Sequence, residues 1–201
     1  MSQVTKTILR RCQDFLASHG FSKHAGQIYT LRLTPSDPIQ GWLGLNHVTH
    51  SGTVDVNPVV GVRHEEVERA VAELLSLPPT CTPTVSTHLG YVTPVATYAP
   101  WVVDSASPER IHEYLEQIPQ YGIPFMRSAD SLEAILRLLE SGQYGFPHEV
   151  AYRLPVVAMF MGPSTRALQL LNKEAERLGD RTDAAAVAYR EFAKRIRERL
   201  E

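Results

Sequence analysis

The fold is decided by residues 39–77, which read IQGWLGLNHVTHSGTVDVNPVVGVRHEEVERAVAELLSL. Along 39–49, Leu43 and Leu45 would lie on one face of a strand and Trp42 on the other. Along 53–62, the valines at 54, 56, 60 and 62 would share one face, and a Ser-Gly pair separates the two runs. This pattern predicts two β-strands that are joined by a tight turn. From His64 onward, apolar residues recur every three or four positions, which predicts an amphipathic helix directly after the second strand. The stretch therefore predicts an antiparallel sheet with a helix packed beside it.

The rest of the chain adds one strand before this stretch and mostly helices after it. Alternation along 27–33 predicts a first strand, and a proline-rich turn is expected at 34–38. One or two further strands are expected, near 85–91 and 98–103, where Val, Thr and Tyr are frequent and charges are rare. Helical spacing and end signals predict further helices at 5–18, 108–121, 131–141, 165–178 and 184–200.

Strands and helices are segregated along the chain, so we expect an α+β fold. It would be an antiparallel β-meander of three to five strands packed by helices, with a helical C-terminal part. We expect a single domain over 1–201, because no Gly/Ser-rich linker interrupts the chain; the alternative is a helical subdomain at 150–201. Residues 154–161 suit a buried strand or a buried helix. We favour a helix that begins near Pro155, because residues 162–164 (GPS) then make a tight turn into the next helix.

Composition argues against several classes of protein. The chain has 201 residues, an apolar share of 43% and a net charge of -2, so it has no general attraction for nucleic acid or an anionic membrane. Its apolar run at 154–161 is far shorter than the roughly 20 residues that span a bilayer. Cys12 and Cys81 lack the spacing of a disulfide framework or a zinc site. We therefore expect a cytoplasmic protein with free thiols and no contact with a membrane.

Histidines are the residues most suited to chemistry in this chain, but no motif assigns a catalytic role. His47 and His50 are three positions apart on a predicted strand, which places them on opposite faces. Asp55 on the paired strand could approach one of them. The histidines would then form a metal or acid–base site on the hairpin; in the alternative, they are two solvent-facing side chains beside a turn. His64 and His88 are further candidates. Zinc sites need three or four assembled ligands, so we expect no metal and no cofactor.

A surface for a partner is expected on the second face of the strand at 39–49. Trp42 and Asn46 lie on the face opposite Leu43 and Leu45, and exposed tryptophan is enriched at interaction hot spots. In the alternative, helices also cover this second face and Trp42 is part of the core. The predicted partner-binding residues are Trp42, Asn46, His47 and His50.

Three short segments carry a resemblance to known proteins. Residues 20–23 (GFSK) ahead of a strand at Tyr29, residues 43–46 (LGLN) and residues 57–63 (NPVVGVR) resemble the opening of small uncharacterised bacterial intracellular proteins. Some families of this kind are encoded beside toxins and act as immunity proteins. The resemblance implies a bacterial protein that binds another protein, and it transfers no catalytic residue.

The leading prediction is a non-enzymatic bacterial protein-binding module of the immunity or defence-associated class. The alternative is a small hydrolase with histidines around the sheet, which requires at least three of them to converge with a carboxylate in one pocket. A third reading is a nucleic-acid binder that uses the basic residues of the last helix, where glutamates interrupt the basic face. The sequence indicates neither the oligomeric state nor the identity of the partner.

Overall fold

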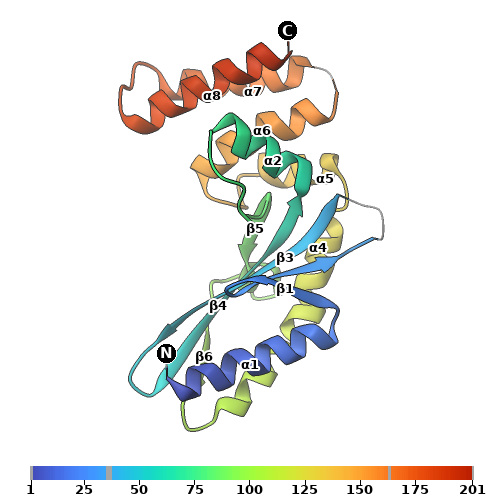
Figure 1. Ribbon diagram of the computed structural model, residues 1–201, viewed down its shortest axis with the longest axis vertical. Helices are drawn as coiled ribbons and strands as arrows, with labels where there is room; N and C mark the ends of the chain where they lie inside the picture. The colour runs from blue at the N-terminus through green and yellow to red at the C-terminus, as the bar shows by residue number, and fades with distance from the viewer. Residues whose placement is uncertain (1, 35–37, 163, 201) are drawn as a thin grey trace. The chain divides into compact units, whose positions relative to one another are not determined.

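The computed structural model describes residues 2–34, 38–162 and 164–200, and the chain has an α+β fold (Figure 1). The predicted fold class, an antiparallel sheet packed by helices with a helical C-terminal part, is confirmed. The turns predicted at 34–38 and 162–164 each include residues that lie outside the described ranges.

The chain divides into two compact units. The sheet unit comprises Met1–Arg63 and Ser86–Ser128, and the helical unit comprises His64–Val85 and Ala129–Glu201. The helical unit thus includes a segment from the middle of the chain, so its extent differs from the subdomain considered at 150–201. The expectation of a single domain stays a prediction.

The sheet unit is built on one sheet, which has six strands within the described residues. Strands β1 to β5 lie in chain order, and β6 pairs with β4 antiparallel from Thr53–Asp104 to Val56–Trp101. Pro58 lies in β4 beyond Val56, where the pairing with β6 ends. Although proline has no amide hydrogen, it therefore removes no hydrogen bond between β4 and β6. The strands are β1 Phe21–Ala25, β2 Ile28–Arg32, β3 Ile39–Thr49, β4 Thr53–His64, β5 Val85–His88 and β6 Trp101–Asp104.

The predicted three-stranded meander is present as β2, β3 and β4. Strand β1 was not predicted, because only Phe21 of its five residues is buried and the strand lacks the alternation of a half-buried strand. The two later strands are present and are shorter than predicted.

One face of the sheet carries helices and forms the core of the sheet unit (Figure 1). Helix α1 (Gln3–Ser18) packs there, and α4 (Ile123–Ser128) crosses β3. Gly41 allows this close crossing, because a Cβ built on it would lie 2.8 Å from the Met126 sulfur. Burial of this apolar face is the main source of stability for the unit. Its fully buried side chains include Tyr29, Leu43, Leu45, Val54, Val56, Val60 and Trp101.

The helix predicted at 108–121 is divided into short turns. The chain forms η2 (Pro108–Arg110), α3 (Ile111–Leu115) and the π-helical turn η3 (Ile118–Gly122), and then continues as α4. The predicted end of the helix at residue 121 was therefore wrong. Pro124 is the second residue of α4, where a missing amide hydrogen costs nothing.

The helical unit is organised around α6, which contacts α2, α5, α7 and α8. Residues 154–160 are helical, as favoured, but α6 begins at Pro147, eight residues before the expected start near Pro155, and Pro155 lies in its interior. A proline inside a helix removes one backbone hydrogen bond, and its ring clashes with the preceding turn. Pro155 is buried together with Val156 and Val157, and this packing offsets the cost. The helices are α2 Glu65–Leu74, α5 Leu132–Glu140, α6 Pro147–Phe160, α7 Ser164–Leu178 and α8 Ala184–Leu200.

Helix α2 ends at Leu74, three residues before the expected end, and its stop is not the proline pair that follows. Ser76 takes a left-handed conformation with a φ of 55°, and the amide of Leu77 donates to the carbonyl of Ala72 at 2.9 Å. This is the hydrogen-bond pattern of a Schellman motif, with serine where glycine is usual. Arg195 stabilises the turn by donating to the Leu74 carbonyl and to the Ser76 hydroxyl, both at 2.7 Å.

None of the helices traced in the described ranges is long and apolar enough to cross a membrane.

Candidate functional site

The four predicted partner-binding residues have different environments. Trp42 exposes only 8% of its surface, and its ring lies over Gly44, where a built Cβ would be 2.6 Å from the ring. Trp42 therefore belongs to the buried part of the sheet unit, which was the alternative reading. Asn46 and His50 are exposed, and His47 is half-buried.

His50 is paired with Asp55, as the sequence suggested. Its Nε2 lies 3.2 Å from the Asp55 carboxylate, and the two side chains are 53% and 26% exposed. Such an exposed pair contributes little stability. No group of three or more metal-ligating side chains occurs among the residues that the structure describes.

His88 is buried and performs a local structural task. Its Nδ1 accepts a hydrogen bond from the amide of Gly90 at 3.1 Å, which caps the short helix η1 (Leu89–Val92). Its Nε2 is buried and has no partner among the described residues. The Tyr98 ring packs against it, with the ring centres 4.4 Å apart. Because a buried imidazolium loses its hydration, burial lowers the pKa of His88 from its ordinary value of 6.5.

This lowered pKa predicts a specific pH dependence of stability. As the pH falls below 6.5, the unfolded chain binds a proton at His88 and the folded chain does not, so the free energy of unfolding decreases until the folded pKa is also passed. We expect His88→Asn, whose amide oxygen can still accept from the Gly90 amide, to reduce this decrease between pH 6.5 and 5. Urea denaturation of both proteins across this range measures it. His50→Asn is the exposed control, and an unchanged slope in His88→Asn would contradict the assignment.

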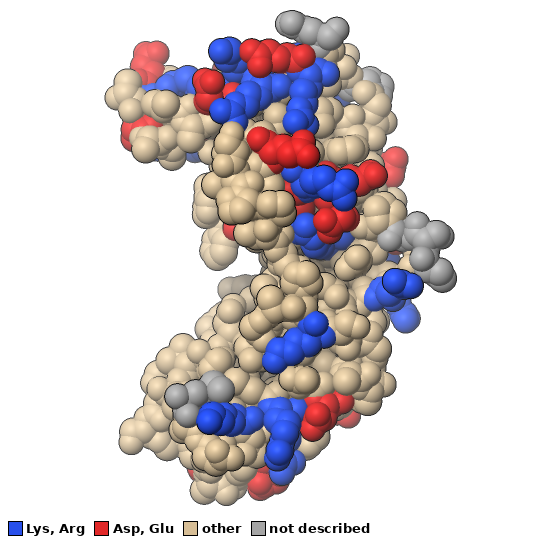
Figure 2. All heavy atoms as spheres, in the orientation of Figure 1, with Lys and Arg blue, Asp and Glu red and all other residues tan. Residues whose placement is uncertain are grey.

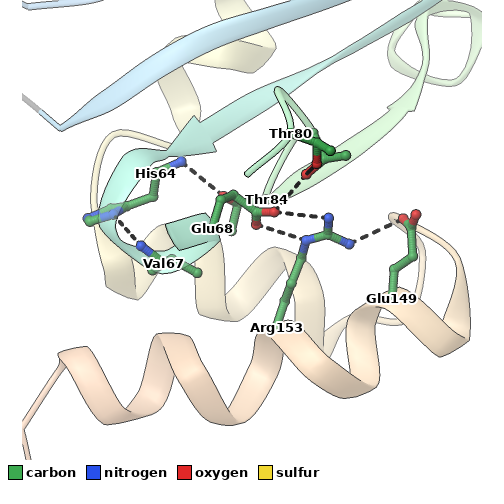
Figure 3. Close-up of polar contacts among 8 residues, drawn as sticks. His64, Val67, Glu68, Thr80, Thr84, Glu149 and Arg153 are labelled. Atoms are coloured by element: carbon green, nitrogen blue, oxygen red, sulfur yellow. Dashed lines mark hydrogen bonds and ion pairs between the residues drawn. The ribbon is translucent and has the colours of Figure 1, made fainter. Parts of the chain in front are cut away.

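His64 belongs to the helical unit and caps α2. Its Nδ1 accepts from the amide of Val67 at 3.4 Å, and its own amide donates to the Thr84 hydroxyl at 2.9 Å (Figure 3). His47, His50, His64 and His88 therefore do not form one cluster in the described residues, and none of them lines either of the two pockets described below.

One of the two cysteines, Cys12, is a free thiol. Cys12 is buried on α1, and burial raises the pKa of its thiol to about 12. A thiol in this state is protonated at neutral pH and is a poor nucleophile.

A buried ion pair joins α2 and α6 in the helical unit (Figure 3). Arg153 donates from Nε and Nη2 to the two carboxylate oxygens of Glu68, at 2.9 and 3.1 Å. The Thr82 hydroxyl donates to the same carboxylate at 3.0 Å, and the Arg153 Nη1 lies 3.3 Å from Glu149. Arg153 and Glu68 are 7% and 5% exposed. A paired geometry with this many hydrogen bonds is what a buried charge requires.

A pocket of about 380 Å³, called here the acidic pocket, opens beside this ion pair. Glu68, Glu149 and Arg153 form its polar end, together with Thr80 and Thr82. Its apolar wall comprises Val71, Ala72, Leu75, Leu77, Pro78 and Tyr152.

The walls of the acidic pocket are held by packing and by the end of α2. The Tyr152 ring packs edge-on against Phe192 at a centroid distance of 4.9 Å and also contacts Tyr189. Leu77 follows the left-handed Ser76 and is 58% exposed, so the strained turn presents an apolar side chain to solvent at the pocket. Strained residues of this kind are often found at ligand sites.

The acidic pocket has an excess of one negative charge. Two carboxylates, Glu68 and Glu149, face one guanidinium, Arg153, and the threonine hydroxyls add further hydrogen-bonding oxygens. His148 lies at the exposed side of the lining. The arrangement suits a ligand with an aliphatic body and one positive charge.

Similarity to known proteins does not assign a function to this chain. No family model, curated protein or solved structure matches this chain. The chemistry of the acidic pocket is therefore the basis for a functional proposal.

Sequence reasoning missed this site. Glu68 is three positions before Val71 and seven before Leu75, so it lies on the apolar stripe of α2, where a charge signals a buried partner. Arg153 directly precedes the apolar run at 154–161 and gives the same signal. Nothing in the sequence could pair two residues that are 85 positions apart.

The basic residues of the last helix are engaged with neighbours in the helical unit. Figure 2 shows positive and negative side chains intermixed on the drawn face of this part of the chain. Arg199 pairs with Glu73 at 3.0 Å, and Arg197 donates to Asn172 at 3.0 Å. Mixed charges of this kind are typical of a solvated helix face. The expectation of no nucleic-acid surface stays a prediction.

Proposed function

We propose that this chain is a non-enzymatic binding protein that takes a lysine or arginine side chain of a partner protein into the acidic pocket. The observation that carries the proposal is the pocket's charge: two carboxylates and a single guanidinium share the pocket with apolar side chains. An aliphatic stem would lie along Val71 and Leu75, and its cationic head would reach Glu149 and the threonine hydroxyls.

The buried ion pair supports binding because it makes the polar end of the acidic pocket rigid. Both oxygens of Glu68 are oriented by Arg153, and Thr82 adds a third hydrogen bond. Glu149 is held toward the same guanidinium and keeps 37% of its side chain exposed, so it can accept a further donor. Preorganised acceptors bind a cation without the entropic cost of ordering mobile side chains.

The hydrolase alternative has less support. It required several histidines to converge with a carboxylate, and His47, His50, His64 and His88 have separate surroundings in the described structure. The resemblance of residues 20–23, 43–46 and 57–63 to families that include immunity proteins makes a toxin or other antagonist the first class of partner to test. We propose a bacterial, immunity or defence-associated role on this basis.

Binding of side-chain analogues tests the proposal. We expect n-butylguanidinium and n-butylammonium to shift the amide NMR signals of Val71, Leu75 and Glu149 saturably, and n-butanol and butyrate to have no such effect. Glu149→Gln is expected to weaken the affinity about threefold to tenfold, because an ion pair at a partly exposed site contributes about 0.6–1.4 kcal/mol. Glu149→Lys is expected to abolish binding.

Glu176→Gln is the matched control, because it removes an exposed carboxylate from α7 in the same unit without touching the acidic pocket. Binding that is equal for the cationic and neutral probes, or equal in Glu149→Lys and the original protein, would overturn the proposal. A partner captured from cells should likewise be lost with Glu149→Lys and retained with Glu176→Gln.

A further inference from the structure

We propose that a second pocket of the helical unit binds a small amphipathic molecule with one negative charge, such as a medium-chain carboxylate. This pocket, called here the α7 pocket, has a volume of about 550 Å³ and is lined by α5, α6, α7 and the segment between α5 and α6. Ligand pockets usually have volumes of about 300–1,000 Å³, so a single small molecule fits.

The apolar part of the α7 pocket suits a hydrocarbon chain or ring. Val150, Leu154 and Pro155 come from α6, and Leu170 comes from α7. Leu139 contributes from the last turn of α5. Burying these surfaces and the matching surface of a ligand contributes roughly 25 cal/mol per Å² of apolar area removed from water.

The backbone beside the α7 pocket is shaped by glycines. Gly142 and Gly145 both have left-handed conformations, with φ values of 68° and 79°, and both line the pocket. A Cβ on Gly145 would lie 3.2 Å from the Val150 side chain. Glycine thus lets the segment after α5 bend closely over the start of α6.

The charges of the α7 pocket determine the ligand's head group. Arg166 pairs with Glu140, and Arg177 donates to Glu174 from Nε at 2.7 Å. Lys173 also lines the pocket, and no ion pair to it occurs within the described residues. The lining therefore carries three positive and two negative side chains and has an excess of one positive charge. A monoanion neutralises this excess, whereas a phosphate dianion would exceed it.

The α7 pocket shares no lining residue with the acidic pocket, and the two have opposite charge preferences. The inference therefore stands independently of the proposed function, and either one can fail alone. A ligand here would contact α6 and α7, the two helices with the closest association in the helical unit.

Titration with sodium decanoate tests the inference. We expect decanoate to shift the amide NMR signals of Val150, Leu170 and Lys173 saturably, with weaker effects from decanol and decyl phosphate and none from decyltrimethylammonium. Lys173→Gln is expected to weaken decanoate binding about threefold to tenfold, and Lys173→Glu is expected to abolish it. Leu170→Asn is expected to weaken decanoate and decanol alike, because it changes the apolar wall.

Lys194→Gln is the control, because Lys194 is an exposed lysine of α8 that does not line the α7 pocket. Absence of saturable shifts, equal binding of decanoate to Lys173→Glu and the original protein, or shifts confined to residues outside the α7 pocket would each overturn the inference. Binding of n-butylguanidinium should be unchanged in Lys173→Glu, which separates this site from the acidic pocket.

Discussion

Replacing Arg153 by methionine is expected to reduce the stability of the helical unit by about 3–5 kcal/mol. The substitution keeps much of the side-chain volume but leaves the Glu68 carboxylate, which is 5% exposed, without its guanidinium. Of the hydrogen bonds to this carboxylate among the described residues, the one from Thr82 would then be left. An uncompensated buried charge is among the most destabilising changes known for a single residue. Urea denaturation, followed by hydrogen exchange at the amides of α2 and α6, measures the effect.

A double variant distinguishes the cost of an orphaned charge from the value of the pair itself. In Glu68→Leu/Arg153→Met both charges are absent, and apolar side chains fill the site. We expect this protein to be more stable than Arg153→Met and close to the original, because desolvation offsets much of the attraction in a buried pair. If the double variant is as unstable as Arg153→Met alone, the loss arises from packing.

Gly44→Ala is expected to destabilise the sheet unit by about 1–3 kcal/mol, the usual cost of overfilling a packed site. A Cβ at residue 44 would lie 2.6 Å from the tip of the Trp42 ring, and this ring is 8% exposed, so it has little room to move. The ring must leave its place over the strand or the strand must shift. Urea denaturation measures the loss, and a red shift of tryptophan fluorescence reports greater exposure of Trp42.

Asn46→Ala is the control for this prediction, because Asn46 is exposed on the same strand two positions further along. We expect its stability to change by less than about 0.5 kcal/mol, as at most surface positions. A neutral Gly44→Ala with unchanged fluorescence would mean that the Trp42 ring is not packed over Gly44 in solution.

Local patterns in the sequence were sufficient for most of the fold. The two-residue period of β2 and β4 and the helical period of α1, α2, α5, α7 and α8 predicted elements that are present in the structure. These signals succeed where one face of an element is more buried than the other, as it is along β2 and the first part of β4. The periodic patterns fail to predict an element when both of its faces are exposed or both are buried. The strand β1 is nearly all exposed, and the residues around Pro155 are buried on several sides.

The candidate site could not be predicted in the same way. The sequence drew attention to Trp42 and to the histidines, yet Trp42 is buried over Gly44 and His64 and His88 each cap a helix. Gly44 and the capping histidines are visible in the sequence. Whether Trp42, His64 and His88 are exposed depends on the residues that pack against them, which the sequence does not show.

Residues 39–77 thus determined by themselves that the chain has an antiparallel sheet followed by a helix, because the period of buried side chains follows directly from backbone geometry. Only the tertiary structure decided that Glu68 of that helix meets Arg153, and that an acidic pocket lies beside the pair. The physical reason is that a buried charge requires a partner, but the sequence does not say which of several opposite charges is brought to it. That choice depends on how α2 and α6 pack.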